Sequence, residues 1–257
     1  MHLPRLLDSV RDLNNLRNEY SELLERAAAD MAARGTIMHT HSGLPFDQRI
    51  GCLFWESDGA LNDYLDISLP QKRVTAETPM HRGPAVFALL RHPRLLDVVE
   101  TFLGPEIYSN PTQHVRMKPP EACLATSGTV VGEIVQTVWH QDLATIMPEA
   151  DESQILTVWI PITEATRKNG CLLVAPGSHR QGLVTHCHDQ RSNYSRQSIP
   201  DRLIGDRRVA LEIKPGDVLF LTKLTMHASL PNRSDDIRWS VDLRYQPTGC
   251  ADTELWR

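Results

Sequence analysis

The chain has 257 residues, of which 41% are hydrophobic and 23% charged, a balance typical of a globular protein with a substantial core. Its 32 acidic residues exceed its 27 basic residues, and this formal charge of -5 argues against nucleic acid or an anionic membrane as a main partner. No apolar run is long enough for a membrane span, no signal core is apparent, and five scattered cysteines favour reduced thiols, so a cytoplasmic protein is expected.

The first third of the chain is expected to be largely helical. Apolar residues recur at spacings of three and four between 9 and 34, which predicts a helix that Gly35 ends. Residues 36 to 80 show a mixed pattern that favours loops and short strands. A second helical stretch covers 84 to 103, and we expect Pro93 to divide it because proline breaks a helix interior.

Short β-rich runs separated by turn residues begin near Ile107. The expected strands are 107–117, 134–142, 154–162, 171–175, 208–213, 217–222 and 237–245. Strands that follow helices in this way favour an α+β protein with a mainly β core, a double-stranded β-helix (a cupin-like jelly roll) flanked by N-terminal helices. One domain over 1–257 is expected, with a helical part at about 1–105 and a jelly-roll core at about 106–248.

The run from Gln136 to Asp142 carries the first candidate ligands. Alternate side chains of a strand share a face, so His140 and Asp142 are expected to project together, with Gln136 and Val138 beside them as candidate substrate contacts. His227, after a later strand, is the candidate third ligand. Two histidines and a carboxylate on one side of an ion leave open positions, which suits iron(II) that binds a cosubstrate and O2.

Eleven residues beyond His227 lies Arg238, which opens an alternating run whose polar face also holds Arg244. A buried guanidinium can hold the far carboxylate of a dicarboxylate through two parallel hydrogen bonds. Arg238 is the first candidate for this role and Arg244 the second. A structural ion pair of Arg238 with Asp242 or Asp217 is the alternative, because buried charges need partners.

Further motifs accompany these residues in order along the chain. They are Met117-Lys118-Pro119-Pro120, Asn169-Gly170-Cys171-Leu172, Pro176-Gly177-Ser178-His179 and Lys214-Pro215-Gly216-Asp217. Together with the candidate ligands and Arg238, they resemble the phytanoyl-CoA dioxygenase family of iron(II)/2-oxoglutarate enzymes. The resemblance covers about residues 85 to 248.

The resemblance implies an oxidoreductase that uses Fe(II), 2-oxoglutarate and O2, and that converts 2-oxoglutarate to succinate and CO2. By similarity Arg238 and Ser229 would hold the cosubstrate, His114 and Trp159 would lie near it, and Thr112 and Arg116 would face the substrate. Related halogenases lack the carboxylate ligand. Because Asp142 is present, hydroxylation of a small molecule is the expected outcome, with desaturation, cyclisation and epoxidation as alternatives.

Other histidine runs and other functions compete with this interpretation. His186-Cys187-His188-Asp189 and His39-x-His41 look like metal-binding runs, but their polar sequence favours surface or lid segments. A non-catalytic, cupin-like metal-binding or sensor protein is one alternative, and a zinc hydrolase is another, although no HExxH motif is present. The sequence does not specify the substrate, and either a monomer or a homodimer is compatible with it.

Overall fold

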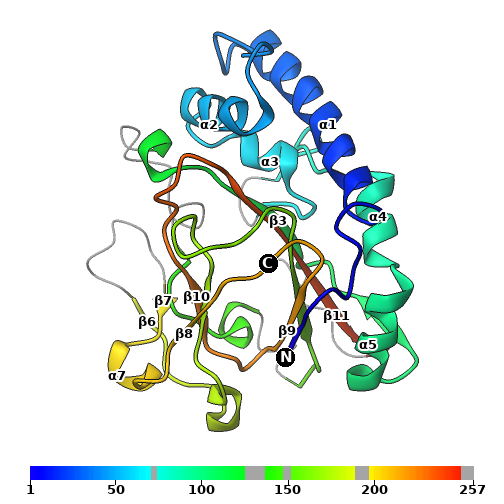
Figure 1. The fold of residues 1–257 in the computed structure, drawn as a ribbon, viewed down its shortest axis with the longest axis vertical. Helices are drawn as coiled ribbons and strands as arrows, with labels where there is room; N and C mark the ends of the chain where they lie inside the picture. Colours follow the sequence, from blue (N-terminus) through cyan, green and yellow to red (C-terminus); the bar gives the residue numbers. More distant parts are fainter. Residues whose placement is uncertain (71–73, 125–136, 147–151, 189–196, 250–257) are drawn as a thin grey trace.

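The fold is described by a computed structural model, which covers residues 1–70, 74–124, 137–146, 152–188 and 197–249. Helices gather at one end and along one side of a central sheet (Figure 1). They are α1 (Asn14–Ala33), α2 (Phe46–Glu56), α3 (Leu61–Leu65), α4 (Pro84–Leu90) and α5 (Pro93–Leu103), whereas the short α7 (Asp201–Ile204) lies apart from them (Figure 1). None of the helices within these ranges is long and apolar enough to cross a bilayer.

The helical predictions are confirmed before residue 36 and after residue 83, but not between them. Helix α1 is followed by Gly35 at φ 71°, and Pro93 begins α5 after a break, as expected. The described part of 36–80 forms α2 and α3, so the expectation of short strands there is wrong. Helix α2 is stabilised by burial of Ile50, Leu53 and Phe54, which recur at helical spacing.

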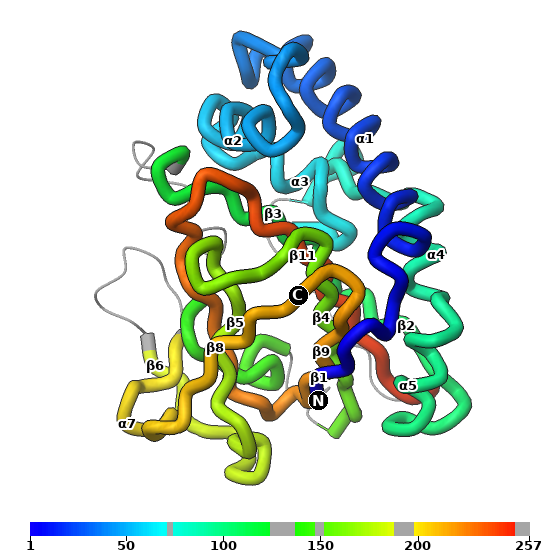
Figure 2. The backbone as a smooth tube through the Cα atoms, viewed as in Figure 1, coloured from blue at the N-terminus to red at the C-terminus, as the bar shows by residue number. Residues whose placement is uncertain are grey.

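Two antiparallel sheets lie behind the helices. The larger sheet has the order β1-β9-β4-β11-β2, with β3 also paired to β11, and the smaller has the order β10-β5-β8. The larger sheet contains β1 (His2–Leu3), β2 (Ile107–Ser109), β3 (His114–Lys118), β4 (Leu156–Pro161), β9 (Val218–Thr222) and β11 (Arg238–Pro247). The smaller contains β5 (Leu172–Val174), β8 (Val209–Leu211) and β10 (His227–Ser229), and β6 (Cys187–His188) pairs with β7 (Gln197–Ser198) apart from both. Figure 2 shows the N-terminal segment running beside β9, where β1 pairs.

The two faces of strand β4 contribute to different parts of the core. All six of its residues are buried. Val158 and Ile160 belong to the hydrophobic cluster that the helices share with the large sheet, and Tyr20 of α1 reaches Trp239 of β11 in the same cluster. Trp159 instead packs with Leu172 of the smaller sheet. Alternate side chains of β4 therefore face the helices and the space between the two sheets.

The strand expected over 134–142 is wrong for the part that the structure describes. Residues 134–136 lie outside the described ranges, and the remainder contributes one isolated β-bridge, between His140 and His227. Asp142 begins a 3₁₀ helix (Asp142–Thr145). Gln141, between the two candidate ligands, is still extended, so their side chains lie on one side as expected, although the segment is not part of a regular strand.

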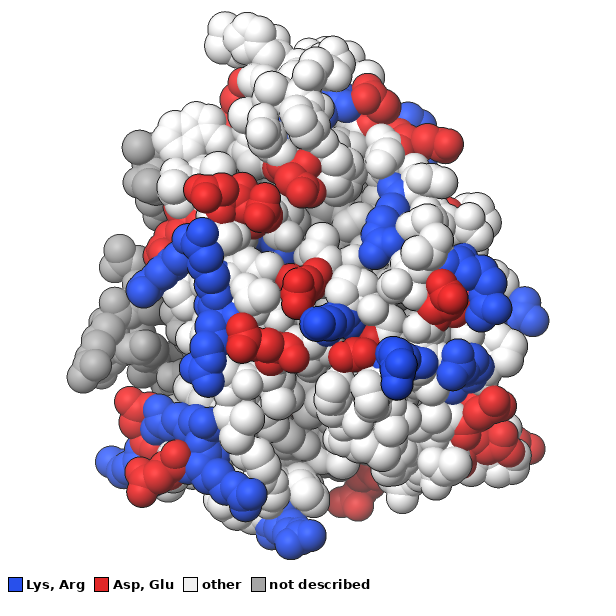
Figure 3. Space-filling model, in the orientation of Figure 1, with Lys and Arg blue, Asp and Glu red and all other residues white. Residues whose placement is uncertain are grey.

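On the face shown in Figure 3, Lys and Arg side chains are interspersed with Asp and Glu, and neither sign covers the face alone.

Candidate metal centre

The backbone bridge brings the two candidate histidines together. The amide of His140 donates to the carbonyl of His227 and the reverse bond is also made, both at 3.0 Å. The two imidazole centroids are 4.2 Å apart. Oδ1 of Asp142 lies 3.6 Å from Nε2 of His140 and 3.8 Å from Nε2 of His227, so one atom of each side chain points to a common place.

Local hydrogen bonds set the tautomer of both imidazoles. Nδ1 of His140 lies 2.8 Å from the carbonyl oxygen of Val138, and Nδ1 of His227 lies 2.9 Å from that of Thr225. A carbonyl oxygen only accepts, so each Nδ1 carries the proton and each Nε2 presents its lone pair. Burial, with the neighbouring His140, lowers the pKa of His227 to about 4, which keeps this imidazole neutral. Two nitrogen lone pairs and a carboxylate oxygen facing one point fit a divalent cation.

Two side chains hold Asp142 in place. Oγ1 of Thr157 donates to Oδ2 at 2.5 Å, and Nη2 of Arg244 lies 3.2 Å from Oδ1. Nη1 of Arg244 donates to the carbonyl of Thr112 at 2.7 Å. Burial opposes ionisation of Asp142, but Arg244 and the two imidazoles outweigh it and hold the carboxyl pKa well below its ordinary value. Arg244 is therefore engaged with a candidate ligand.

A small cavity of about 50 Å³ adjoins this cluster, between the two sheets. Its lining combines polar and apolar side chains. It consists of Arg116, Thr137, His140, Thr157, Trp159, Leu172, Leu221, His227, Ala228, Arg238, Ser240, Asp242 and Arg244. Arg116, Trp159 and Arg238, three of the site residues predicted from the sequence, thus line one cavity with the two histidines.

Arg238 is buried in this cavity with few polar contacts. Nη1 donates to Oγ of Ser240 at 2.5 Å, and the guanidinium lies 5.8 Å from the ring centre of Trp159. Its Nε has no acceptor within the described ranges. Burial lowers its pKa to about 10, so it remains charged at neutral pH.

Arg238 forms no salt bridge with either aspartate proposed as an alternative partner, although the charge of Asp242 raises the pKa of Arg238 against the effect of burial. Asp242 accepts from Nε of Arg116 at 3.3 Å. Asp217 lies near the N-terminus, where it contacts Nε2 of His2 at 3.2 Å and accepts from the amide of Arg5. The direct ion pairs of these two aspartates are therefore with Arg116 and His2 rather than with Arg238.

Lys118 is a site residue whose role the sequence does not reveal. It lies directly across the β3–β11 ladder from Arg238, and its Nζ donates to Oγ of Ser229 at 2.7 Å and to the carbonyl of Leu230 at 2.6 Å. Burial, followed by the charges of Arg238 and Arg116, lowers the pKa of Lys118 to about 6. The available signal was its place in the Lys-Pro-Pro motif, which marks the end of β3.

Three other predicted site residues, His114, Thr112 and Val138, are not part of the cavity lining. His114 pairs through Nδ1 with Oδ2 of Asp66 at 2.8 Å. Thr112 and Val138 contribute backbone carbonyls, which bind Arg244 and His140. Gln136 lies outside the described residues.

Gln141, between the two candidate ligands, fastens a later segment beside them. Its side chain donates to the carbonyls of Gly182 and Leu224 and accepts from the amide of Val184. The backbone amide of Gln141 donates to Nε2 of His186 at 3.1 Å. Residues 182–186 are therefore hydrogen-bonded to Gln141, the residue between His140 and Asp142.

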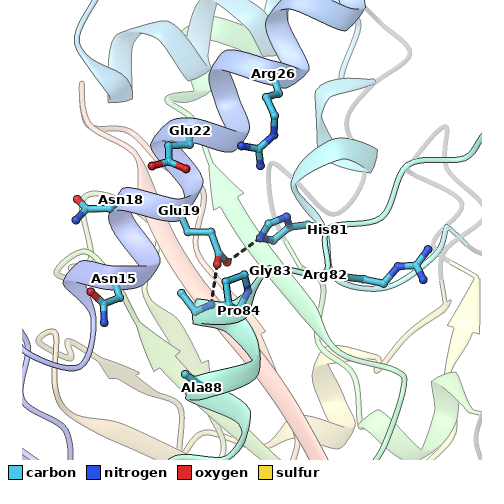
Figure 4. Close-up of a pocket in the computed structure, with 11 residues that line it drawn as sticks. Asn15, Asn18, Glu19, Glu22, Arg26, His81, Arg82, Gly83, Pro84 and Ala88 are labelled. Atoms are coloured by element: carbon cyan, nitrogen blue, oxygen red, sulfur yellow. Dashed lines mark hydrogen bonds and ion pairs between the residues drawn. The ribbon is translucent and has the colours of Figure 1, made fainter.

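A larger groove of about 680 Å³ lies elsewhere, between α1 and the start of α4. Figure 4 shows Glu19 directed toward His81 and the first turn of α4. Glu19 contacts Nε2 of His81 at 2.8 Å and accepts from the amide of Ala85 at 2.7 Å. Because this carboxylate caps a helix, we assign the groove a structural role and place the chemistry at the smaller cavity.

Fold and site together define a two-sheet protein with a candidate centre of two histidines and one carboxylate. A family model described as phytanoyl-CoA dioxygenase (PhyH) matches residues 3–240. The chain belongs to this family.

Curated relatives agree with the family assignment. The peroxisomal phytanoyl-CoA dioxygenase of Bos taurus is 28% identical over 186 residues, which cover 71% of this chain and 52% of that protein. The 1-deoxypentalenic acid 11-beta-hydroxylase of Streptomyces arenae is 31% identical over 179 residues, 66% of this chain and 60% of that one. The chain spans about half the length of the phytanoyl-CoA dioxygenases that it matches.

Solved structures show the same fold. EvdO2 from Micromonospora carbonacea var. aurantiaca, complexed with 2-oxoglutarate, is 29% identical with a TM-score of 0.50, covering 66% of this chain and 68% of that one. The epimerase SnoN, in complex with Fe3+, alpha ketoglutarate and nogalamycin RO, has a TM-score of 0.57 at 18% identity, covering 98% of this chain and 80% of that one. The second likeness concerns the fold alone.

Proposed function

We propose that this chain is an iron(II)- and 2-oxoglutarate-dependent dioxygenase that oxidises a small molecule with O2. His140, Asp142 and His227 would hold the iron, and Arg238 the far carboxylate of 2-oxoglutarate. The fold would be the double-stranded β-helix, forming a single domain with its N-terminal helices. Their shared hydrophobic cluster supports the single domain.

The observation that carries this proposal is the distribution of charge around the cavity. Asp142 is paired with Arg244, and Asp242 with Arg116. Arg238 and Lys118 have no carboxylate partner within the described ranges, although both are buried. Burying the charged guanidinium of Arg238 without a bound acid is costly, so the site fits an anion that supplies the missing charge. A dicarboxylate held by the cation at one end would face Arg238 with the other, and its charge would favour the protonated form of the neighbouring Lys118.

Ser229 fits the same ligand. Its hydroxyl oxygen accepts from Nζ of Lys118 at 2.7 Å and from the amide of Thr137 at 3.0 Å. With both lone pairs used, its single proton is left to donate to a carboxylate oxygen. Arg238, Lys118 and Ser229 would together orient one end of the cosubstrate and exclude water from it.

The other parts of the chain would place the reacting groups. Bound iron(II) supplies the redox centre at which O2 reacts with cosubstrate and substrate. Thr157 and Arg244 fix the ligand carboxylate, and the carbonyls of Val138 and Thr225 fix the imidazoles. The small cavity has room for an acid group rather than a complete substrate, so the substrate would lie beyond it, with Arg116 as a candidate contact.

Hydroxylation is the proposed outcome, and 2-oxoglutarate would be converted to succinate and CO2. The carboxylate of Asp142 at the third ligand position supports it, as does the likeness to a 1-deoxypentalenic acid hydroxylase. Desaturation, cyclisation and epoxidation are alternative outcomes of the same site. The partner would be a small molecule, and the protein a monomer or homodimer.

The test is succinate formation from 2-oxoglutarate with Fe(II), ascorbate and O2, with and without added substrates. We expect His140→Ala to abolish it. Arg238→Met should raise the 2-oxoglutarate concentration required by at least about tenfold, because a charge-assisted contact is worth roughly 1.5–3 kcal/mol. Arg233→Met, at an exposed arginine, is the matched control and should change nothing. Succinate release that survives His140→Ala would contradict the proposal, and binding without turnover would favour a sensor.

A further inference from the structure

We propose that His39, His41 and Glu56 form a second site for a divalent cation of the zinc class. The three residues lie on the segment between α1 and α2 and at the last residue of α2, and none lines the cavity described above. Each offers one ligand atom, and these atoms all lie within 4.8 Å of one another. The polar sequence around His39-x-His41 favours a surface or lid segment, and the structure adds Glu56 beside the two histidines.

The separations of the donor atoms fit one shared ion. Oε1 of Glu56 lies 3.6 Å from Nδ1 of His39, which is too long for a hydrogen bond. Ligands about 2.1 Å from a tetrahedral zinc lie about 3.4 Å from each other. Nε2 of His41 lies 2.5 Å from the same oxygen, so this contact would open by about 1 Å when a cation replaces the hydrogen bond.

Glu56 is already oriented for this role. Its Oε2 accepts from the amides of Met38 and His39 at 3.0 and 3.2 Å, which directs Oε1 toward the two imidazoles. A carboxylate that uses one oxygen for the backbone keeps the other for a metal.

The backbone between the histidines is also fixed. Nε of Arg49 donates to the carbonyl of Thr40 at 2.8 Å, and the Arg49 guanidinium is itself bound to Glu25 of α1. Arg49 and Glu56 are two helical turns apart on α2, so they fasten the segment from one face of the helix. A cation would therefore need only side-chain rotation, and little entropy would be lost on binding.

The chemistry and exposure of the donors select the ion. Two imidazoles with one carboxylate suit Zn²⁺, Co²⁺, Ni²⁺ or Cu²⁺ rather than Ca²⁺ or Mg²⁺. The side chain of His39 is 69% exposed, and those of His41 and Glu56 are 22% and 21% exposed, so an ion can enter from solvent and keep water as a fourth ligand. The bound ion would tie the segment that follows α1 to the end of α2.

The test counts Co²⁺ or Zn²⁺ bound by the full-length, tag-free chain, by equilibrium dialysis with elemental analysis. Wild type should bind two equivalents, one at the centre around His140 and one here. His39→Ala and Glu56→Gln should each bind one. His179→Ala, which removes an exposed histidine elsewhere, should still bind two. The exposed position of His39 makes loss of fold by His39→Ala unexpected, and circular dichroism checks it.

A second background separates this site from the proposed active site. His140→Ala should retain one equivalent, and the double variant His140→Ala/His39→Ala should retain none. Hydrogen exchange gives an independent readout, because Zn²⁺ should slow exchange of the amides at 38–44 in wild type but not in His39→Ala. A second equivalent that persists in His39→Ala, or exchange that Zn²⁺ leaves unchanged, would overturn the proposal whatever the catalytic activity is.

Discussion

Replacing Thr157 by valine should weaken metal binding without disturbing the sheet. The hydroxyl of Thr157 donates to Oδ2 of Asp142 at 2.5 Å. The backbone of Thr157 lies opposite that of Arg244 in the β4–β11 ladder. Valine has nearly the same shape and favours strands, so Thr157→Val removes the hydrogen bond and leaves the backbone pairing intact. Arg244 remains beside Oδ1, so the carboxylate should stay ionised.

The size of the effect follows from two independent magnitudes. A hydrogen bond to a charged acceptor contributes about 1.5–3 kcal/mol. Loss of a residue that supports a ligand typically reduces metal affinity by about 10- to 100-fold, which corresponds to about 1.4–2.8 kcal/mol. We therefore expect the Kd for Co²⁺ to rise by about 10- to 100-fold in Thr157→Val.

Anaerobic calorimetric titration with Co²⁺ measures this change. The titration is made in the His39→Ala background, so that the proposed second site does not contribute heat. Thr157→Ser keeps the hydroxyl and is the matched control, with affinity close to that of the background protein. Equal affinities for the Val and Ser variants, with the fold intact, would refute the assigned role of Thr157.

Three further outcomes are expected. The pKa of Lys118, near 6, should rise when a dianion binds, so 2-oxoglutarate binding should take up a proton above pH 6 and weaken as the pH rises. Calorimetry in buffers of different ionisation enthalpy should show this proton uptake, and the Lys118→Met variant should lack it. Arg244→Met should raise the low pKa of Asp142, so that loss of bound metal on acidification begins at a higher pH than in wild type, and an unchanged profile would remove Arg244 from this role. Gln141→Leu should speed hydrogen exchange across 182–186, and unchanged exchange would show that the segment is fastened otherwise.

Local signals in the sequence were sufficient for several elements. The period of α1 and the break at Pro93 are properties of neighbouring residues, and both were predicted. Helix α2 was missed because Arg49 is buried beside its apolar residues, where it binds Glu25 and Thr40. A buried arginine breaks the apolar pattern that marks a helix face, and its partners lie elsewhere in the chain.

The convergence of His140, Asp142 and His227 was expected from the sequence, but for an incomplete reason. The alternation argument assumed a regular strand, whereas Gln141 is extended outside any strand and one backbone bridge brings His227 to His140. That bridge joins residues far apart in the chain, and a single sequence carries no direct signal for it.

Lys118 and Thr157 were missed as site residues for a related reason. Each contacts a residue on another element, Ser229 of β10 for Lys118 and Asp142 for Thr157. Which elements lie side by side is set by the assembled sheets, so such contacts become visible only in the structure.

A crystal structure with Co²⁺ and 2-oxoglutarate, recorded at the cobalt absorption edge, tests the central claim most directly. An anomalous peak should lie within bonding distance of Nε2 of His140, Nε2 of His227 and a carboxylate oxygen of Asp142. The far carboxylate of 2-oxoglutarate should contact the guanidinium of Arg238. Cobalt bound without one of these three side chains, or a dicarboxylate turned away from Arg238, would contradict the account.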